Sequence, residues 1–205
     1  WYRFKIGITS VAGAVSQWND QSGNARDLLQ ATGAAQPALQ SDGSLLFDGA
    51  ASFMNVLFTL NQPASFYLLF NPVTRTNLDR FFDGGSLVGS IMGLSDTVTD
   101  PQVILNAGSS LTTGAGVGPT TGTYSAVCSV VNGASSVIQI NNGTATTGNT
   151  GANNTNGFTL GAVRGGGYNW SNIQVKEVII YSAAHDAATR RTVINYLGQV
   201  GNISV

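Results

Sequence analysis

Short apolar runs separated by turn residues fill most of the sequence, and they constrain the fold more than any other feature. Examples of such runs are Phe66 to Phe70, Thr123 to Val131 and Ile173 to Tyr181. Strong turn signals lie between or just after them: Asp83-Gly84-Gly85, Asn132-Gly133 and Asn142-Gly143. This pattern is typical of antiparallel strands in a sandwich or barrel, not of alternating strands and helices. It predicts an all-β fold whose clearest hairpin is at Asn132-Gly133.

The run Phe66 to Phe70 differs from a half-exposed strand. Phe66, Leu68 and Phe70 alternate with Tyr67 and Leu69, so both faces of the run are apolar. A strand with this pattern is covered on both sides, because an exposed face would carry polar residues. We expect it to be a central strand.

One segment has helical rather than strand periodicity. It runs from Asp186, a good N-cap residue, to Gln199. Its apolar residues fall at helical spacing: Val193, Ile194, Leu197 and Val200. The pattern predicts one short C-terminal helix (186–199) that Gly198 or Gly201 ends and that closes one end or edge of the fold.

Length and composition limit the number of domains and the classes of partner that the protein can have. The chain has 205 residues, which suits one domain over residues 1–205, with 1–43 as an N-terminal segment packed on the sandwich. It starts at Trp1 without a methionine, so we expect it to be part of a longer chain. Charged residues make up 9% of the sequence and the net charge is −1, which argues against nucleic acid as a partner. No apolar run is long enough to cross a membrane. The single cysteine, Cys128, lies in an apolar run and is expected to be a buried, inert thiol.

The segment from Trp18 to Asn24 is the most specific motif in the chain. Asp20 and Ser22 can hydrogen-bond to nearby backbone, and Gly23 can supply a positive φ angle. The segment therefore predicts a fixed loop. The run Leu45 to Gly49 follows it and is expected to contain the first regular strand.

Taken in order, several pieces of the chain match a known pattern. They are Trp18 to Asn24, Gln36-Pro37, Phe47-Asp48-Gly49, Phe66 to Phe70, Asn142-Gly143, and Ile173 to Tyr181 followed by the helix with Tyr196-Leu197. The chain resembles the laminin-G-like, concanavalin-A-like jelly-roll domains of bacteriophage structural proteins and bacterial secreted proteins. The resemblance implies a two-sheet antiparallel jelly-roll sandwich, with its concave face or rim loops available for binding. It assigns a structural role to the motif residues Trp18, Asp20, Ser22, Gly23, Asp48 and Gly49.

The sequence offers little for catalysis. Glycoside hydrolases of this fold need two carboxylates on one strand face, and no Glu-x-Asp-x-Glu run occurs. Glu177 lies within a long strand-like run, and strict alternation would point its neighbour Lys176 to the opposite face. A structural role is expected for Glu177, and His185 is expected on the surface near the helix cap. The sequence predicts a protein that is not an enzyme.

A structural calcium ion is an open alternative at Asp20 and Asp48, because relatives of this fold hold calcium with Asp, Asn and backbone oxygens. Both residues lie beside glycines in apparent turns. Capping of backbone N–H groups is the favoured interpretation of such carboxylates, and no other cofactor or metal site is expected.

The candidate binding loop contains Arg164, Tyr168, Asn169 and Trp170. Aromatic faces and planar amide or guanidinium groups are the contacts that sugars use. The alternative is that Trp170 folds back into the core while Tyr168 covers the rim.

The leading hypothesis is a non-catalytic surface module, either virion or extracellular. Its expected partners are a glycan or host-surface receptor, or other virion proteins, and it could form a homo-oligomer. The alternative is a carbohydrate-binding module of a secreted carbohydrate-active enzyme, or such an enzyme itself.

Overall fold

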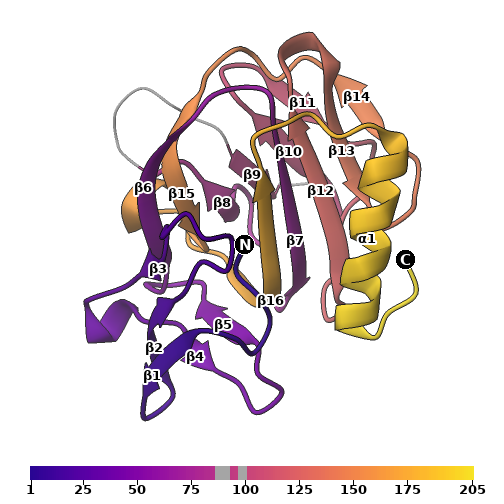
Figure 1. Cartoon of the computed structure of the whole chain (residues 1–205). Helices are drawn as coiled ribbons and strands as arrows, with labels where there is room; N and C mark the ends of the chain where they lie inside the picture. Colours follow the sequence, from indigo (N-terminus) through magenta and orange to yellow (C-terminus); the bar gives the residue numbers. More distant parts are fainter. Residues whose placement is uncertain (86–92, 97–100) are drawn as a thin grey trace.

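The computed structural model describes residues 1–85, 93–96 and 101–205. Within these residues the fold is all-β with one α-helix, at the C-terminal end, as the sequence predicts (Figure 1). No helix among them is long and apolar enough to cross a membrane. The described part of the chain also contains three short 3-10 turns: η1 (Gly33–Ala35), η2 (Gly133–Ser135) and η3 (Arg164–Gly166).

The strands fall into two halves and a connecting part. The first half consists of β6 (Met54–Leu60), β8 (Arg80–Asp83), β9 (Gly93–Asp96), β10 (Val103–Asn106), β11 (Ser110–Thr112) and β15 (Thr155–Leu160). The second half consists of β7 (Ala64–Pro72), β12 (Ser125–Val131), β13 (Ser136–Ile140), β14 (Thr146–Gly148) and β16 (Asn172–Tyr181). The connecting strands are β2 (Ala14–Trp18), β3 (Leu28–Leu29), β4 (Ala38–Leu39) and β5 (Leu45–Asp48), with β1 (Ile8–Val11) paired to β2 outside the main path.

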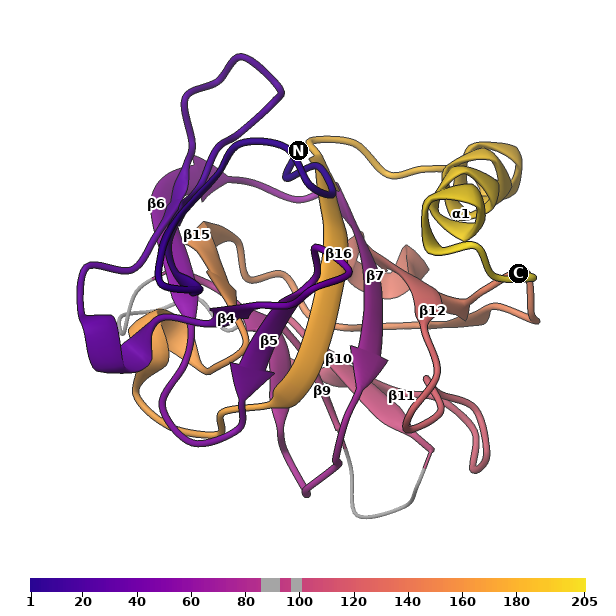
Figure 2. The ribbon, with the colours of Figure 1, turned by 90° about the horizontal axis from the view of Figure 1, so that it is seen from below.

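Hydrogen bonds join these strands into one continuous sheet, whereas two separate sheets were expected. The order is β11-β10-β9-β8-β15-β6-β3-β2-β4-β5-β16-β7-β12-β13-β14. The two halves therefore meet through β3, β2, β4 and β5. At the other end the terminal strands also approach each other, because the Leu111 side chain of β11 lies against Gly148 of β14. The result is a nearly closed barrel (Figure 2).

The main hydrophobic core lies between the two halves. Phe66 of β7 stacks with Phe82 of β8 at 5.0 Å between ring centroids and with Phe158 of β15 at 6.2 Å. Every residue of β7 is buried, and its odd-numbered residues Tyr67 and Leu69 belong to a second core on the outer side. The prediction of a central strand covered on both sides is confirmed.

The second core lies under helix α1 (Ala187–Gly201). Asp186 caps the helix as predicted, since its side chain accepts a hydrogen bond from the Thr189 amide at 2.8 Å. Ile194 and Leu197 are fully buried in this core. The helix covers the outer face of β7, β12 and β16 instead of closing an end or edge (Figure 1). Its last residue is Gly201, one of the two glycines expected to end it, and the C-cap residue that follows, Asn202, has the left-handed conformation with φ 53°.

The predicted turns join paired strands. β12 pairs antiparallel with β13 across Asn132-Gly133, and β13 pairs with β14 across Asn142-Gly143. β8, which ends at Asp83, pairs antiparallel with β9; residues 86–92 of their connection lie outside the described residues.

Regular structure starts well before Leu45, where the sequence placed the first strand. β2 ends at Trp18, whose side chain is fully buried and donates from Nε1 to the Arg3 carbonyl oxygen at 3.1 Å. The N-terminal segment is therefore part of the sheet itself.

Candidate functional site

The Asp20 carboxylate organises the loop that follows β2. Its side chain is 2% exposed. Its Oδ1 accepts from the backbone nitrogens of Trp1 at 2.8 Å and Ser22 at 2.9 Å, and its Oδ2 accepts from the Ser22 hydroxyl at 2.7 Å. Burial works to raise the pKa of Asp20, but these hydrogen bonds outweigh it and hold the pKa at about 2. Asp20 is thus a charged acceptor whose oxygens are already in use.

The end of the loop is held equally firmly. Asp27 Oδ1 accepts from the Asp20 amide at 2.8 Å, and the buried Tyr2 hydroxyl donates to the Arg26 carbonyl oxygen at 2.5 Å. Gly23 has φ +83°, which a glycine adopts without strain. These contacts fix the backbone from Asp20 to Asp27, so the side chains between them have defined positions.

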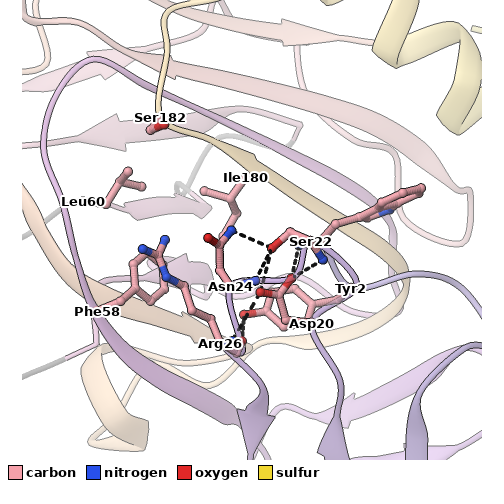
Figure 3. A pocket seen from close by; sticks show the side chains of 10 residues that line it. Tyr2, Asp20, Ser22, Asn24, Arg26, Phe58, Leu60, Ile180 and Ser182 are labelled. Carbon is pink, nitrogen blue, oxygen red and sulfur yellow. Dashed lines mark hydrogen bonds and ion pairs between the residues drawn. The ribbon is translucent and has the colours of Figure 1, made fainter.

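A groove lies between this loop, strand β6 and the end of β16 (Figure 3). The loop contributes Asp20, Ser22, Asn24 and Arg26 to its wall. Apolar side chains from the strands form the floor: Phe58, Leu60 and Ile180. A recess of about 80 Å³ near Asp20 adjoins a larger one of about 400 Å³ near Asn61, and Asn24, Arg26, Leu60 and Ser182 line both. The two recesses form one groove.

Arg26 is the charged side chain at the junction of the recesses. Its guanidinium carbon lies 4.4 Å from the centre of the Phe58 ring, over which it stacks (Figure 3). Sequence reasoning missed both residues. They lie far apart in the chain, and the pairing of Leu29 in β3 with Asn55 in β6 brings them together.

The Arg164–Trp170 loop that the sequence singled out lies elsewhere, and none of its residues lines the groove. Tyr168 is 47% exposed, and its hydroxyl accepts from Arg164 Nη2 at 3.3 Å. The Asn169 carbonyl oxygen accepts from the Arg80 amide at 3.0 Å. Trp170 is half-buried, so it is neither a fully exposed binding residue nor the buried core residue of the alternative interpretation.

Asp83, at the end of β8, lies beside that loop. It is 2% exposed, and its Oδ2 is 3.8 Å from Arg80 Nε. Burial raises the pKa of Asp83 above its usual range, while the charges of Arg80 and Arg164 act in the opposite direction. A buried carboxyl group with a raised pKa can mark a functional site, but it can equally belong to a structural ion pair.

Asp48 and Asp20 both use their oxygens to accept hydrogen bonds from the protein. Asp48 Oδ1 accepts from the amides of Ala50, Ala51 and Ser52, each at 2.9 Å, and from the Ser52 hydroxyl at 2.8 Å. Donors that surround a carboxylate in this way leave no room for a cation on the same oxygen. Within the described residues, no group of three or more His, Cys, Asp or Glu side chains could hold a metal ion.

Glu177 is buried and joins three parts of the molecule. It is 1% exposed, and it accepts from Trp1 Nε1 at 2.7 Å, the Tyr196 hydroxyl at 2.6 Å and the Phe4 amide at 3.2 Å. Lys176, which was expected on the opposite face, lies over the ring of Tyr124 on the same side as Glu177. A β-bulge between Val175 and Glu177 explains this, because an extra residue breaks strict alternation.

Cys128 lies in the core under the helix, and His185 lies directly before the N-cap residue of the helix. His185 lies near the helix cap as expected and is half-buried, and its Nδ1 lies 2.8 Å from the hydroxyl of the fully buried Tyr67. Cys128 is buried as predicted, and burial raises the pKa of its thiol to about 12. The thiolate that a nucleophile needs is therefore not formed near neutral pH.

A second, mainly apolar recess of about 260 Å³ lies between α1 and β16. Trp1, Tyr181, Val193 and Tyr196 are among its lining residues. It offers few polar groups to orient a ligand, so the groove beside Arg26 is the better candidate site.

Comparison with known proteins identifies the class of fold. No family model matches the chain, and no curated protein matches it. Among solved structures it is similar to Trypanosoma rangeli sialidase, with 16% identity and a TM-score of 0.69 over 95% of this chain and 32% of that chain. The same sialidase in complex with sialic acid gives 17% identity and a TM-score of 0.66.

An arabinofuranosidase complexed with arabinofuranosyl-α-1,2-xylobiose is also similar, with 13% identity and a TM-score of 0.68 over 92% of this chain and 51% of that chain. This chain therefore spans about a third of the sialidase and about half of the arabinofuranosidase. At such low identity, the likeness shows a shared all-β fold.

Proposed function

We propose that this protein is a non-catalytic glycan-binding module and that the groove beside Arg26 and Phe58 holds the glycan. The observation that supports this proposal most is the mixed lining of the groove, in which apolar side chains lie beside hydroxyl, amide and guanidinium groups. A sugar ring has apolar C–H faces and a rim of hydroxyl groups, so such a lining complements both. The two similar structures with bound sugars support this class of ligand.

The chemistry of the groove supports binding without catalysis. Hydrolysis of a glycosidic bond by the usual route needs two carboxyl groups, one of which donates a proton. Among the residues that the structure describes, Asp20 is the one carboxylate that lines the groove, and its pKa of about 2 keeps it deprotonated near neutral pH. It has neither a carboxyl partner in the lining nor a proton to donate.

The setting we propose is a laminin-G-like, concanavalin-A-like jelly roll displayed on a virion or outside a cell, where it binds host-surface glycans or decorates the particle. The two halves of the sheet that face each other across one core are compatible with that architecture. The order of the sequence motifs supports it as well.

An accessory module of a carbohydrate-active enzyme is the second candidate. The observation that favours it is that this chain spans only part of two glycan-processing enzymes. If the chain were itself catalytic, Asp83 would be the candidate proton donor, because its pKa is raised. Hydrolysis of any polysaccharide by the purified protein, abolished by Asp83→Asn, would contradict the non-catalytic proposal.

A glycan array tests the proposed groove with a substitution that fills it. Ser182 is exposed and lines both recesses, so Ser182→Trp should block glycan binding while leaving the fold intact. Ala184→Trp is the matched control, because Ala184 is exposed on the same connection but does not line the groove. We expect wild type and Ala184→Trp to retain the same glycans and Ser182→Trp to retain none.

Tyr168→Ala distinguishes the groove from the Arg164–Trp170 loop on the same array. If the groove is the site, Tyr168→Ala binds as wild type does. Loss of binding in Tyr168→Ala, with normal binding in Ser182→Trp, would move the site to that loop and refute the groove.

A further inference from the structure

The guanidinium group of Arg26 is held in place by stacking, but it has no hydrogen-bond or ion-pair partner among the described residues. It stacks on Phe58, and its side chain is half-buried between the loop and β6. Among the residues that the structure describes, none accepts a hydrogen bond from this group or forms an ion pair with it, and the lining of both recesses includes Arg26. A guanidinium group carries five N–H donors in a planar fork, and Figure 3 shows that of Arg26 over Phe58 and directed toward Leu60, which also lines the groove.

The neighbouring carboxylates of Asp20 and Asp27 do not pair with the guanidinium group of Arg26. Asp20 accepts from Trp1 and Ser22, as described above. Asp27 accepts from the Asp20 amide at 2.8 Å and from Gln17 Nε2 at 2.9 Å. The hydrogen bonds that both carboxylates accept hold the loop in place. The rest of the lining near Arg26 is neutral, including Asn24, Asn61 and Ser182.

We propose that the glycan bound in the groove is acidic and that Arg26 binds its carboxylate or sulfate group. This inference rests on the proposed function and names the class of its ligand. Arg26 lies over the face of Phe58, and a guanidinium group held against an aromatic face can still form two parallel hydrogen bonds to an anion from its edge.

The sizes of the recesses agree with this arrangement. The recess of about 80 Å³ lies well below the usual range for a bound small molecule, so a sugar ring does not fit in it. The recess of about 400 Å³ lies within the usual range for a bound small molecule, roughly 300–1,000 Å³. The sugar ring therefore occupies the larger recess, and the acidic group lies at Arg26, which lines both recesses, rather than deep in the smaller one beside the charged Asp20 carboxylate.

The test is a glycan array on which each neutral glycan stands beside its uronic acid, sialylated and sulfated derivatives, followed by calorimetric titration of the best set. For wild type we expect the acidic member to bind roughly 10- to 100-fold more tightly than its neutral parent. Arg26→Gln should remove that preference, and Arg26→Lys should keep part of it. Arg191→Gln removes the same charge from an exposed position on α1 and should change nothing. Binding to the carboxylate or to the sulfate derivatives identifies which anion is recognised.

Wild type alone provides a second measurement that does not depend on how a variant folds. Its preference for the acidic glycan should shrink as salt rises, because ions screen the charge of Arg26. Equal binding of acidic and neutral glycans, or a preference that survives Arg26→Gln, would overturn the acidic-ligand proposal alone. Binding of no glycan of either kind would refute the proposed function, and this inference with it.

Discussion

Asp48 shows how one carboxylate can fix a turn. Four donors converge on its Oδ1 atom. Partial burial acts to raise the pKa of Asp48. The backbone hydrogen bonds from Ala51, Ser52 and Ala50 outweigh this effect and lower the pKa well below its usual range. Hydrogen bonds to a charged acceptor are stronger than those to a neutral one, and the residue is partly exposed, so water weakens them. Asp48→Asn keeps the acceptor atom and removes its charge.

We predict that Asp48→Asn lowers the free energy of unfolding by about 1 kcal/mol near pH 7. Because the folded-state pKa is lowered, this contribution is complete above the pKa of an unfolded aspartate, roughly 3.9, and is lost as the pH falls below that value. Urea unfolding of both proteins at pH 7 and pH 3 measures it. If the difference in unfolding free energy between wild type and Asp48→Asn were as large at pH 3 as at pH 7, the charge of Asp48 would not be its cause.

Local contacts were predictable from the sequence, and long-range ones were not. Asp20 and Ser22 contact each other two residues apart, so their spacing indicates the hydrogen bonds they make. Arg26 and Phe58 meet because β3 pairs with β6, and β3 is too short to leave a periodic signal. The candidate groove depends on that pairing, so sequence reasoning directed attention to the Arg164–Trp170 loop instead.

Strand β16 shows how one irregular position changes the interpretation of a whole element. The bulge before Glu177 turns this carboxylate toward α1, where it meets the Tyr196 hydroxyl at 2.6 Å and Trp1 Nε1 at 2.7 Å. A buried acceptor with such donors holds the helix and the N-terminus on one strand. Strict alternation predicts the side on which residues lie only where no bulge occurs.

We predict that Glu177→Gln destabilises the protein by about 1–3 kcal/mol, because an amide cannot replace a charged acceptor of several donors. In a double-mutant cycle its effect should not add to that of Tyr196→Phe, since the two side chains share one hydrogen bond. Tyr168→Phe is the control, because the Tyr168 hydroxyl bonds to Arg164 and not to Glu177. Full additivity of Glu177→Gln with Tyr196→Phe would contradict this account.

The all-β class and the helix were predictable because both leave periodic patterns over many residues. The continuity of the sheet was not predictable. β3 and β4 have two residues each, and the stretch from Asn19 to Gln40 is polar in composition, so it resembles a linker. Their pairing depends on β2, whose Trp18 is anchored in the main core. Residues 1–43 therefore join the two halves of the molecule.

This role of residues 1–43 predicts how the whole molecule responds to their removal. Tyr2, Val15, Trp18 and Leu28 are each at most 2% exposed and belong to the main core, so deletion removes both core side chains and the connecting strands. We expect the shortened chain to lose cooperative unfolding in urea and to bind a hydrophobic dye, as states with loosened packing do. Val11→Ser changes a residue of the same segment that is 76% exposed, and it should unfold as wild type does. If the shortened chain unfolded cooperatively with the wild-type midpoint, residues 1–43 would be a covering layer and the two halves would hold together without them.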